Sequence, residues 1–492
     1  MDARKMLLLS ALVFFSSGAA FGHGRDTVAY RVEASGGAST GRHAPLWFTA
    51  NRWGLSSADA AGGYLRAGAT YARPLRAGFR IEAAADMASG WGIGAPVVVQ
   101  QAYVDMSWRR LRLSVGSKQR WGYPMDKNHR LSSGMMVEGP GARPVPQVRA
   151  DIADFVPVPL TRGWLSFKGH LAYGIFTDNK WQQGFAAPGG LYTRNTLYHS
   201  KSAALRVGRA DRFPLTVDIG ILTAAQFGGM KMRKRADGSS VMVENMPNRL
   251  PDFFYMLMPS QESTLQNVQG NHCGSWNVSL DYHGRAWSAR VYMEHYFEDH
   301  SQLTMQYGLW RDGQLGVEVT LPRNRWVKTL LWEGLSTTDQ TGPILYDGVG
   351  GTFTDLQMSG CDNYYNNGQF LGWQHWGLGM GSPLMPGPAY NADGSNEFKS
   401  NRVRAHHVGV DGQPSDEWAY RLLLSHVRHW GTYREPLDRV RLQVSTYAEA
   451  TYSPRKLPGW SMAMAVGIDG GDYLGASAGM MFTIKKTGIC AR

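Results

Sequence analysis

The 492-residue sequence has little cysteine and, beyond its first residues, no long apolar run. It contains an odd number of cysteines, Cys273, Cys361 and Cys490, and they lack the spacing of metal ligands. The sequence neither requires nor excludes a disulfide between Cys273 and Cys361. After residue 22 no uninterrupted apolar stretch reaches the roughly 18 residues that a transmembrane helix needs, so helical membrane proteins are excluded. A Gly-x-Ser-x-Gly nucleophile elbow and a phosphate-binding glycine loop between a strand and a helix are also lacking, so nothing indicates nucleotide binding.

The N-terminus has the pattern of a cleavable secretory signal. Arg4 and Lys5 precede an apolar run over residues 6–15, and small residues follow as far as Gly22, where we expect cleavage. In hydrocarbon only helices and closed barrels satisfy every backbone N–H and C=O group. For an exported membrane chain without an apolar helix, the expected fold is therefore a closed β-barrel. We therefore expect a signal peptide over residues 1–22 and one barrel domain over 23–492.

Alternation of apolar and polar side chains predicts membrane strands of about 10 residues. In residues 460–469 the even positions are apolar and the odd positions are small or polar, so one face suits lipid and the other suits water. Recurrence of this pattern argues for one sheet, and the alternative is a secreted β-sandwich or propeller. The other segments with the pattern are residues 79–86, 98–107, 111–118, 165–176, 215–221, 276–282, 287–297, 315–321, 418–424, 440–449 and 480–485.

The same pattern predicts which side chains face the lumen. In residues 79–86 the odd positions are expected outward and the charged even positions, Asp86 among them, inward. In residues 98–107 the even positions, beginning with Val98 and Gln100, are expected to face outward. The lumen is therefore expected to be wet and to carry charges of both signs.

Three connections are too long for periplasmic turns, and such loops normally face outward. They cover residues 120–162, 228–271 and 336–401, and the third is the richest in aromatic and amide side chains. Sugars present apolar C–H faces and many hydroxyls, so aromatic rings beside amides, carboxylates and guanidinium groups suit them. The alternative is that the aromatics form interfacial girdles and that Asn and Gly form turns. The predicted polysaccharide-binding residues are Asp362, Tyr364, Tyr365, Asn366, Asn367, Trp373, His375, Trp376 and Arg402.

The formal net charge of +12 raises the question of an acidic partner. Export argues against nucleic acid. Two partners stay open: lipid A phosphates at the barrel rim, and an acidic polysaccharide.

Histidines and acidic residues invite a metal or catalytic interpretation, which their spacing weakens. His406 and His407 are adjacent, so on a strand they point to opposite faces and cannot jointly chelate. Glu294, His295 and Glu298 motivate a hydrolase hypothesis, although no spacing establishes the carboxylate separation that glycosidic cleavage needs. A hydrated strand end or lumenal salt bridges explain the cluster as well. We expect no catalytic residue, metal or cofactor.

Several short motifs occur in a fixed order along most of the mature chain. They are Pro144-Val145-Pro146-Gln147-Val148-Arg149, Gly163-Trp164-Leu165-Ser166-Phe167-Lys168-Gly169-His170, Phe176-Thr177-Asp178-Asn179, Gly270-Asn271-His272-Cys273-Gly274-Ser275-Trp276, His295-Tyr296-Phe297-Glu298-Asp299, Asp339-Gln340-Thr341-Gly342-Pro343, Asp362-Asn363-Tyr364-Tyr365-Asn366-Asn367, Gly372-Trp373-Gln374-His375, Gly381-Ser382-Pro383-Leu384 and Gly431-Thr432-Tyr433.

With these motifs the chain resembles the Wzi capsule assembly proteins, particularly the branch found in Bacteroides-like bacteria. The resemblance implies an all-β, transmembrane antiparallel β-barrel of about 18 strands in the outer membrane of a Gram-negative bacterium, inserted by the barrel assembly machinery. It also implies a lectin that holds capsular polysaccharide at the cell surface without exporting it. Better-known members carry a helical periplasmic plug, whereas residues 34–65 here show no run of amphipathic helices. Cys273 stands where this branch is expected to have an apolar residue, so a family-wide disulfide is not expected.

The main alternative function is a diffusion porin or transporter for small polar solutes. Charged positions expected inward motivate it, and conductance in planar bilayers distinguishes it from a binder. These positions include Arg80, Glu82, Asp86 and Arg441.

Overall fold

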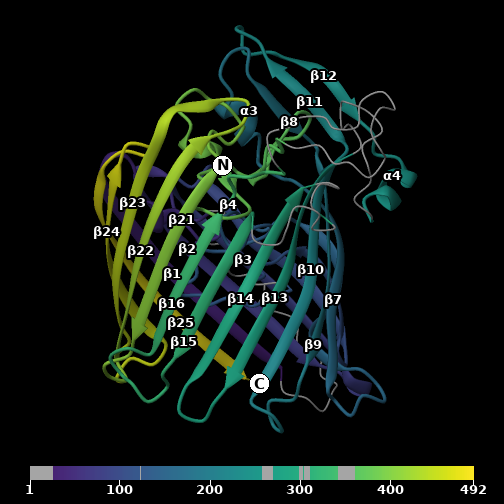
Figure 1. The fold of residues 1–492 in the computed structure, drawn as a ribbon, viewed down its shortest axis with the longest axis vertical. Helices are drawn as coiled ribbons and strands as arrows, with labels where there is room; N and C mark the ends of the chain where they lie inside the picture. Colours follow the sequence, from purple (N-terminus) through teal and green to yellow (C-terminus); the bar gives the residue numbers. More distant parts are fainter. Residues whose placement is uncertain are drawn as a thin grey trace.

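In the computed structural model of the chain, 18 of the described strands form one antiparallel sheet (Figure 1). The first wall strand, β1 (Thr27–His43), pairs with the last, β25 (Ser477–Ala491), so the sheet closes into a barrel. The predicted all-β barrel of about 18 strands is therefore confirmed. The predicted signal peptide lies outside the described residues. The structure describes residues 26–121, 124–257, 270–298, 303, 311–341 and 361–491.

Each wall strand pairs antiparallel with the wall strands before and after it in the chain. This up-and-down order needs only hairpin connections, which alternate between the two ends of the barrel. The other wall strands are β2 (Asp59–Pro74), β3 (Phe79–Trp91), β4 (Val97–Trp108), β5 (Leu111–Ser117), β6 (Gln147–Pro157), β7 (Leu165–Ile175), β9 (Leu197–Val207), β10 (Leu215–Phe227), β13 (Asn271–His283), β14 (Ser288–Glu298), β15 (Gly313–Thr320), β16 (Thr329–Ser336), β21 (Val403–Gly412), β22 (Trp418–Gly431), β23 (Pro436–Tyr452) and β24 (Trp460–Gly471).

Apart from the 3-10 turn η2 (Arg76–Gly78), which lies between β2 and β3 at the opposite end, the smaller elements gather at one end of the barrel. A three-stranded sheet of β8 (Leu191–Arg194), β11 (Gly229–Lys234) and β12 (Ser240–Met246) rises above the rim (Figure 1). No helix among the described residues is long and apolar enough to cross a membrane. The shorter elements are the helices α2 (Leu46–Thr49), α3 (Trp181–Phe185) and α4 (Leu250–Tyr255), the 3-10 turns η2 (Arg76–Gly78) and η4 (Pro388–Tyr390), and the two-residue strands β17 (Asn366–Asn367), β18 (Leu371–Gly372), β19 (Gln374–His375) and β20 (Leu378–Gly379).

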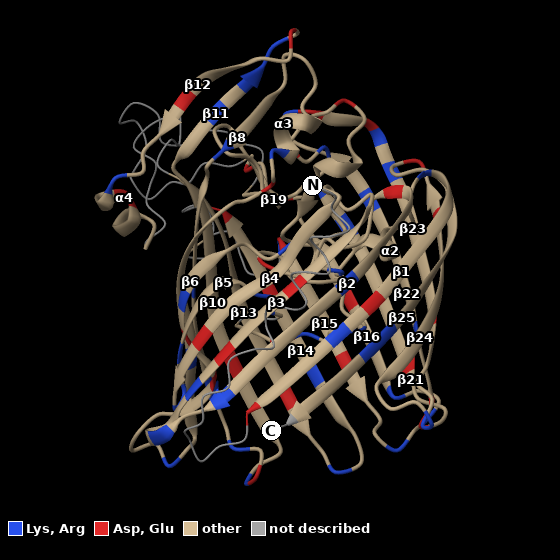
Figure 2. Cartoon of the chain, turned by 180° about the vertical axis from the view of Figure 1, so that it is seen from behind, with Lys and Arg blue, Asp and Glu red and all other residues tan. Residues whose placement is uncertain are grey.

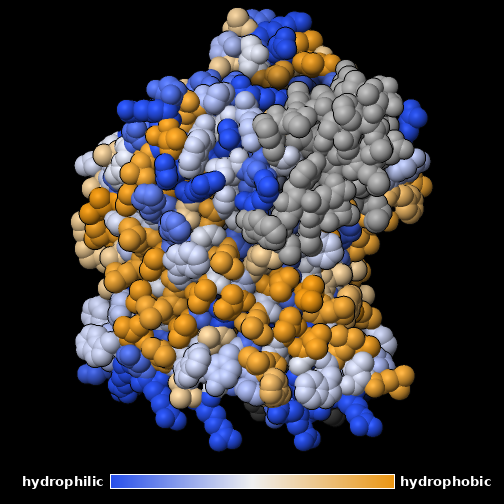
Figure 3. Space-filling model, viewed as in Figure 1, coloured by the Kyte–Doolittle hydropathy of each residue, from blue (hydrophilic) through white to orange (hydrophobic). Residues whose placement is uncertain are grey.

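The wall strands have the two faces that the alternation predicts. In β24, Met464 and Ile468 are 48% and 53% exposed, whereas Ala465 and Asp469 are 3% and 4% exposed. The outward apolar side chains form a belt around the middle of the barrel (Figure 3). His407 is likewise buried inside the barrel while its neighbour His406 points outward, which confirms that the two cannot chelate together.

The predicted orientation of Val98 and Gln100 is wrong because β4 contains a β-bulge. Asp86 pairs with Gln101 but Met87 pairs with Val99, so one extra residue shifts the alternation. Val98 and Gln100 are consequently buried, and the Gln100 side-chain amide donates to the Trp53 carbonyl at 2.9 Å. After the bulge the predicted orientation holds.

The eight turns at the other end of the barrel are short, and short turns mark the periplasmic end of such barrels. The expectation that all three long connections face outward is only partly correct. Residues 229–246 do rise above the rim as β11 and β12. Residues 147–157 instead form wall strand β6, and 124–146 fold back into the barrel, where polar wall side chains bind them.

Candidate functional site

Three of the described loops at the outer end fold inward and form what we call the luminal plug, residues 44–58, 124–146 and 361–401. Their apolar side chains share one buried cluster, which includes Trp47, Leu131, Met136, Tyr365 and Trp373. Hydrogen bonds also join the loops, because the Gly139 N–H donates to the Met380 carbonyl at 2.8 Å. The plug is thus a packed body inside the barrel that is built mainly of loops, in keeping with a sequence that shows no run of amphipathic helices over residues 34–65.

A buried ion pair anchors the plug to the wall. Lys127 Nζ lies 2.5 Å from Glu294 Oε2 on β14, and the two side chains are 0% and 1% exposed. Glu294 Oε1 also accepts from the Met136 N–H at 3.0 Å. The carboxylate therefore holds two points of the same loop.

Glu333 on β16 makes a second anchor. Its Oε1 accepts from Ser132 Oγ at 2.7 Å, and its Oε2 accepts from the Ser133 N–H at 2.6 Å. Tyr292 Oη on β14 donates to the same carboxylate. These two inward-facing carboxylates of the wall therefore bind groups of the plug.

Three predicted sugar-contacting aromatics lie inside the plug. Tyr364, Tyr365 and Trp373 are each 0% exposed. Trp373 Nε1 donates to the Val137 carbonyl at 2.8 Å, and Tyr365 Oη donates to the Met136 carbonyl. These side chains have internal partners, and sugar contact through them stays a prediction.

Tyr364 Oη donates to Asp312 Oδ2 at 3.1 Å, in the connection before β15. Asp312 also accepts from the backbone N–H groups of Asp339 and Gln340 at 3.1 and 2.6 Å. Burial raises the pKa of the Asp312 carboxyl to about 6, although these hydrogen bonds act in the opposite direction. Asp312 therefore joins two loops through a carboxyl that titrates near neutral pH.

The predicted amide and histidine side chains also have structural partners. The Asn366 amide donates to the Phe398 carbonyl at 2.8 Å, and Asn367 Oδ1 accepts from the Gln369 N–H at 2.8 Å in a turn. His375 Nδ1 lies 2.8 Å from the Arg143 carbonyl, and its Nε2 lies 2.9 Å from the Thr177 carbonyl and 3.2 Å from the Thr177 backbone nitrogen. Burial lowers the pKa of His375, although these two carbonyl contacts act in the opposite direction.

The remaining three predicted residues are partly exposed. The Trp376 ring lies under the Arg143 guanidinium, whose carbon is 4.3 Å from the ring centroid. Asp362 Oδ2 accepts from Thr341 Oγ1 at 3.0 Å. The Arg402 guanidinium carbon lies 3.8 Å from the centroid of the Tyr433 ring. These residues keep surface that a ligand can reach.

Around Arg402 the structure assembles a polar and aromatic surface that we call the outer cluster: Arg311, Asp339, Asp362, Arg402 and Tyr433. Tyr433 Oη donates to the Asp339 carbonyl at 3.0 Å, and Arg311 Nη1 lies 3.1 Å from Asp339 Oδ1. The Arg311 side chain is 51% exposed and that of Asp339 is 26% exposed. The cluster therefore offers guanidinium and carboxylate groups beside a tyrosine ring.

Sequence reasoning missed three members of the outer cluster, Arg311, Asp339 and Tyr433. They come from the connections before β15, after β16 and between β22 and β23. The available signal was topological, because all three connections meet at the end that carries the aromatic loop.

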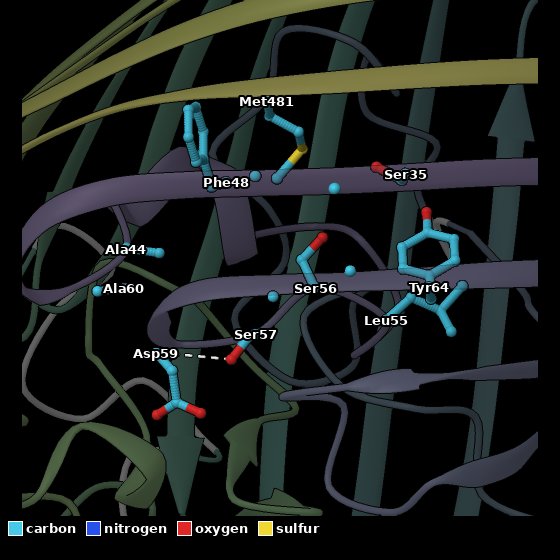
Figure 4. Close-up of a pocket in the computed structure, with 14 residues that line it drawn as sticks. Ser35, Ala44, Phe48, Leu55, Ser56, Ser57, Asp59, Ala60, Tyr64 and Met481 are labelled. Atoms are coloured by element: carbon cyan, nitrogen blue, oxygen red, sulfur yellow. Dashed lines mark hydrogen bonds between the residues drawn. The ribbon is translucent and has the colours of Figure 1, made fainter.

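A small cavity between β1, β2 and α2 is too small for a sugar (Figure 4). Ser35, Phe48, Tyr64 and Met481 help to line it, and its volume is about 20 Å³. That volume suits about one water molecule, whereas ligand pockets usually measure hundreds of Å³.

The acidic cluster of the hydrolase hypothesis connects the wall to the plug. Glu298 Oε1 accepts from Tyr296 Oη and from the Tyr365 N–H, each at 2.6 Å. His295 Nδ1 donates to the Asp312 carbonyl at 2.9 Å. Within the described ranges no group of three His, Cys, Asp or Glu side chains is placed to hold a metal ion.

Comparison with known proteins supports the fold. No family model and no curated protein sequence matches the chain. Among solved structures it is similar to Wzi of Escherichia coli, described as an outer membrane protein involved in group 1 capsule assembly and a carbohydrate-binding β-barrel. The TM-score is 0.56 and the identity 11%, over 92% of this chain and 83% of Wzi. OprD of Pseudomonas aeruginosa aligns with a TM-score of 0.47 and 10% identity, over 97% of this chain and 98% of OprD. The chain has the fold of an outer-membrane β-barrel.

Proposed function

We propose that this protein is a lectin-like, non-enzymatic outer-membrane binder that attaches capsular or another surface polysaccharide to the cell. The supporting observation is the luminal plug, whose buried anchors at Glu294 and Glu333 occupy the route that a porin leaves to solutes. The similar fold of Wzi, described as a carbohydrate-binding β-barrel, adds support. The resemblance in the sequence motifs points the same way.

The outer cluster is the proposed contact surface. Tyr433 supplies an aromatic ring, while Arg402 and Asp362 supply hydrogen-bonding groups for sugar hydroxyls. Arg402 and Arg311 also suit an acidic polysaccharide, because guanidinium groups bind carboxylates in pairs of hydrogen bonds. Of the predicted residues, Asp362 and Arg402 belong to this surface, whereas Trp376 keeps its exposed area outside the outer cluster, beside Arg143. The buried predicted residues position the loops.

The test is a glycan array with purified protein, together with capsule retention on cells. We expect Arg402→Ala with Tyr433→Ala to lose glycan binding and to release capsule. The matched control is Arg428→Ala with Trp430→Ala, a second pair in which an arginine lies over an aromatic ring, 5.3 Å from its centroid, on wall strand β22. Equal binding by wild type and the outer-cluster variant, with the barrel assembled, contradicts the proposal.

The porin alternative keeps one supporting observation, the charged positions along the wall strands (Figure 2), some of which form ion pairs inside the barrel. Arg66 Nη2 lies 2.6 Å from Asp86 Oδ2, and Arg206 Nε lies 2.7 Å from Asp218 Oδ1. Planar-bilayer recording separates the two functions. Stable, ion-selective openings from the wild-type protein favour the porin, and their absence favours the binder.

A further inference from the structure

The short turns carry most of the excess positive charge of this protein. The eight turns contain twelve Arg and Lys residues and three acidic residues, whereas the formal charge of the whole chain is +12. Figure 2 marks positions of Lys and Arg along this end. The basic residues are Arg76, Arg109, Arg110, Arg162, Arg209, Arg212, Arg285, Arg323, Arg325, Lys328, Arg455 and Lys456, and the acidic ones are Asp211, Asp416 and Glu417.

Few of these charges are neutralised within the described structure. Arg209 and Arg212 lie near Asp211, and Arg455 lies near Asp416. The other nine basic side chains are exposed and form no ion pair with a described residue. A concentration of unpaired cations at one end is costly through self-repulsion unless an anion lies beside it.

Aromatic side chains accompany the charges. Six of the seven basic turns carry an exposed Phe or Trp within three residues of an Arg. Arg109 lies over the neighbouring Trp108 ring, 5.0 Å from its centroid. Tryptophan and tyrosine gather at the headgroup level of membranes, so these rings mark the height of the lipid interface. The six aromatics are Phe79, Trp108, Trp164, Phe213, Trp287 and Trp326.

We propose that these turns form a ring that binds the phosphate headgroups of anionic phospholipids in the periplasmic leaflet of the outer membrane. The cations lie just beyond the aromatic level, where lipid phosphates lie, and below the apolar belt (Figure 3). Basic side chains near an anionic membrane surface are attracted to it at short range. The ring lies at the opposite end of the barrel from the outer cluster and does not depend on the proposed sugar site.

The distribution of charge favours lipid over a soluble acidic partner. The basic turns follow β2, β4, β6, β9, β13, β15 and β23, so they occur around the wall. A protein or polysaccharide contacts one arc of such a ring, whereas a lipid leaflet surrounds all of it. The turn after β21 is the exception, because it carries Asp416 and Glu417.

The experiment is native mass spectrometry of the full-length protein in detergent, with phosphatidylglycerol or phosphatidylcholine added at equal concentration. We expect wild type to prefer phosphatidylglycerol and to lose that preference at high salt. Each basic side chain near the surface contributes about fivefold in affinity at low salt. Arg109→Gln, Arg110→Gln, Arg323→Gln and Arg325→Gln together are therefore expected to reduce phosphatidylglycerol binding by about tenfold or more.

Two matched variants make the outcome decisive. The same four positions changed to Lys keep the charge and are expected to keep the preference. Four exposed arginines at the outer end, changed to Gln, remove equal charge and are expected to leave it unchanged. Equal binding of both lipids by wild type, or an equal loss in the outer-end variant, overturns the proposal, as does binding of soluble polyglutamate without a lipid preference. The outer-end arginines are Arg233, Arg235, Arg428 and Arg434.

Discussion

Replacement of Lys127 with alanine tests whether buried charge holds the luminal plug in the barrel. The ammonium group uses all three of its donors: it pairs with Glu294 at 2.5 Å, donates to the Gly134 carbonyl at 2.9 Å and donates to Gln314 Oε1. In Lys127→Ala, Glu294 keeps hydrogen bonds from the Met136 N–H and Ser275 Oγ but loses the counter-charge that Lys127 provides. A buried carboxylate is then left without a cation.

Removal of one partner of a buried ion pair costs about 3–5 kcal/mol. An exposed pair in the same loop provides the comparison, because Arg130 lies 3.2 Å from Asp411 with its side chain 43% exposed. Such a pair contributes about 1 kcal/mol or less. Lys127→Ala and Arg130→Ala each remove one positive charge from the same loop and differ mainly in how deeply that charge is buried. We therefore expect Lys127→Ala to lower the free energy of unfolding more than Arg130→Ala does.

The assay combines urea unfolding in detergent, followed by tryptophan fluorescence, with conductance in planar bilayers. We expect Lys127→Ala to lower the free energy of unfolding by about 3 kcal/mol and to raise conductance as the plug detaches. Lys127→Met with Glu294→Gln removes both charges and is expected to recover most of the stability. If Lys127→Ala matches Arg130→Ala in stability and wild type in conductance, the plug is not held by this pair and the reasoning is refuted.

Three further predictions follow from the plug and the thiols. The raised pKa of Asp312 means that its folded state holds the proton more tightly than the unfolded chain, so its stabilising contribution is complete below about pH 4 and is lost as pH rises through about 6. Asp312→Asn should remove this dependence, about 3 kcal/mol, from urea titrations at pH 4 and 7. Trp373→Ala should lower the free energy of unfolding by about 3–5 kcal/mol because the ring is fully buried, whereas the partly exposed Trp376→Ala should cost less; equal losses contradict this packing. Cys273 is buried, whereas Cys361 is partly exposed and Cys490 is exposed, so maleimide should label Cys361 and Cys490 in the native protein and Cys273 only after unfolding, as peptide mass spectrometry can check.

The sequence alone was sufficient for the barrel. Alternation with a period of two is the pattern expected for a wall with lipid on one side and polar groups on the other. The orientation of residues such as Met464 and Asp469 can therefore be assigned without knowledge of the strands that pair with theirs. The bulge at Gln100 escaped this reasoning because an extra residue in one strand is defined only by its pairing with β3.

The candidate site was predicted less well, because a loop sequence without periodicity does not indicate which of its side chains are buried or which segments pack over them. The aromatic and amide loop was expected at the surface, yet Tyr365 and Trp373 bond to the carbonyls of Met136 and Val137, more than 200 residues earlier in the chain. Arg402 and Tyr433 lie in contact because they belong to connections that are adjacent at the outer end of the barrel.

The sequence by itself determined a closed β-barrel of the outer-membrane type, because strand periodicity and the need to satisfy every backbone group in lipid are local constraints. Only the tertiary structure decided that two long connections fold inward and which polar side chains stay exposed. The physical reason is that burial of Lys127, Glu294 and Glu333 is favourable only when distant segments of the chain provide their binding partners in the folded state. A local sequence pattern contains no information about such long-range contacts.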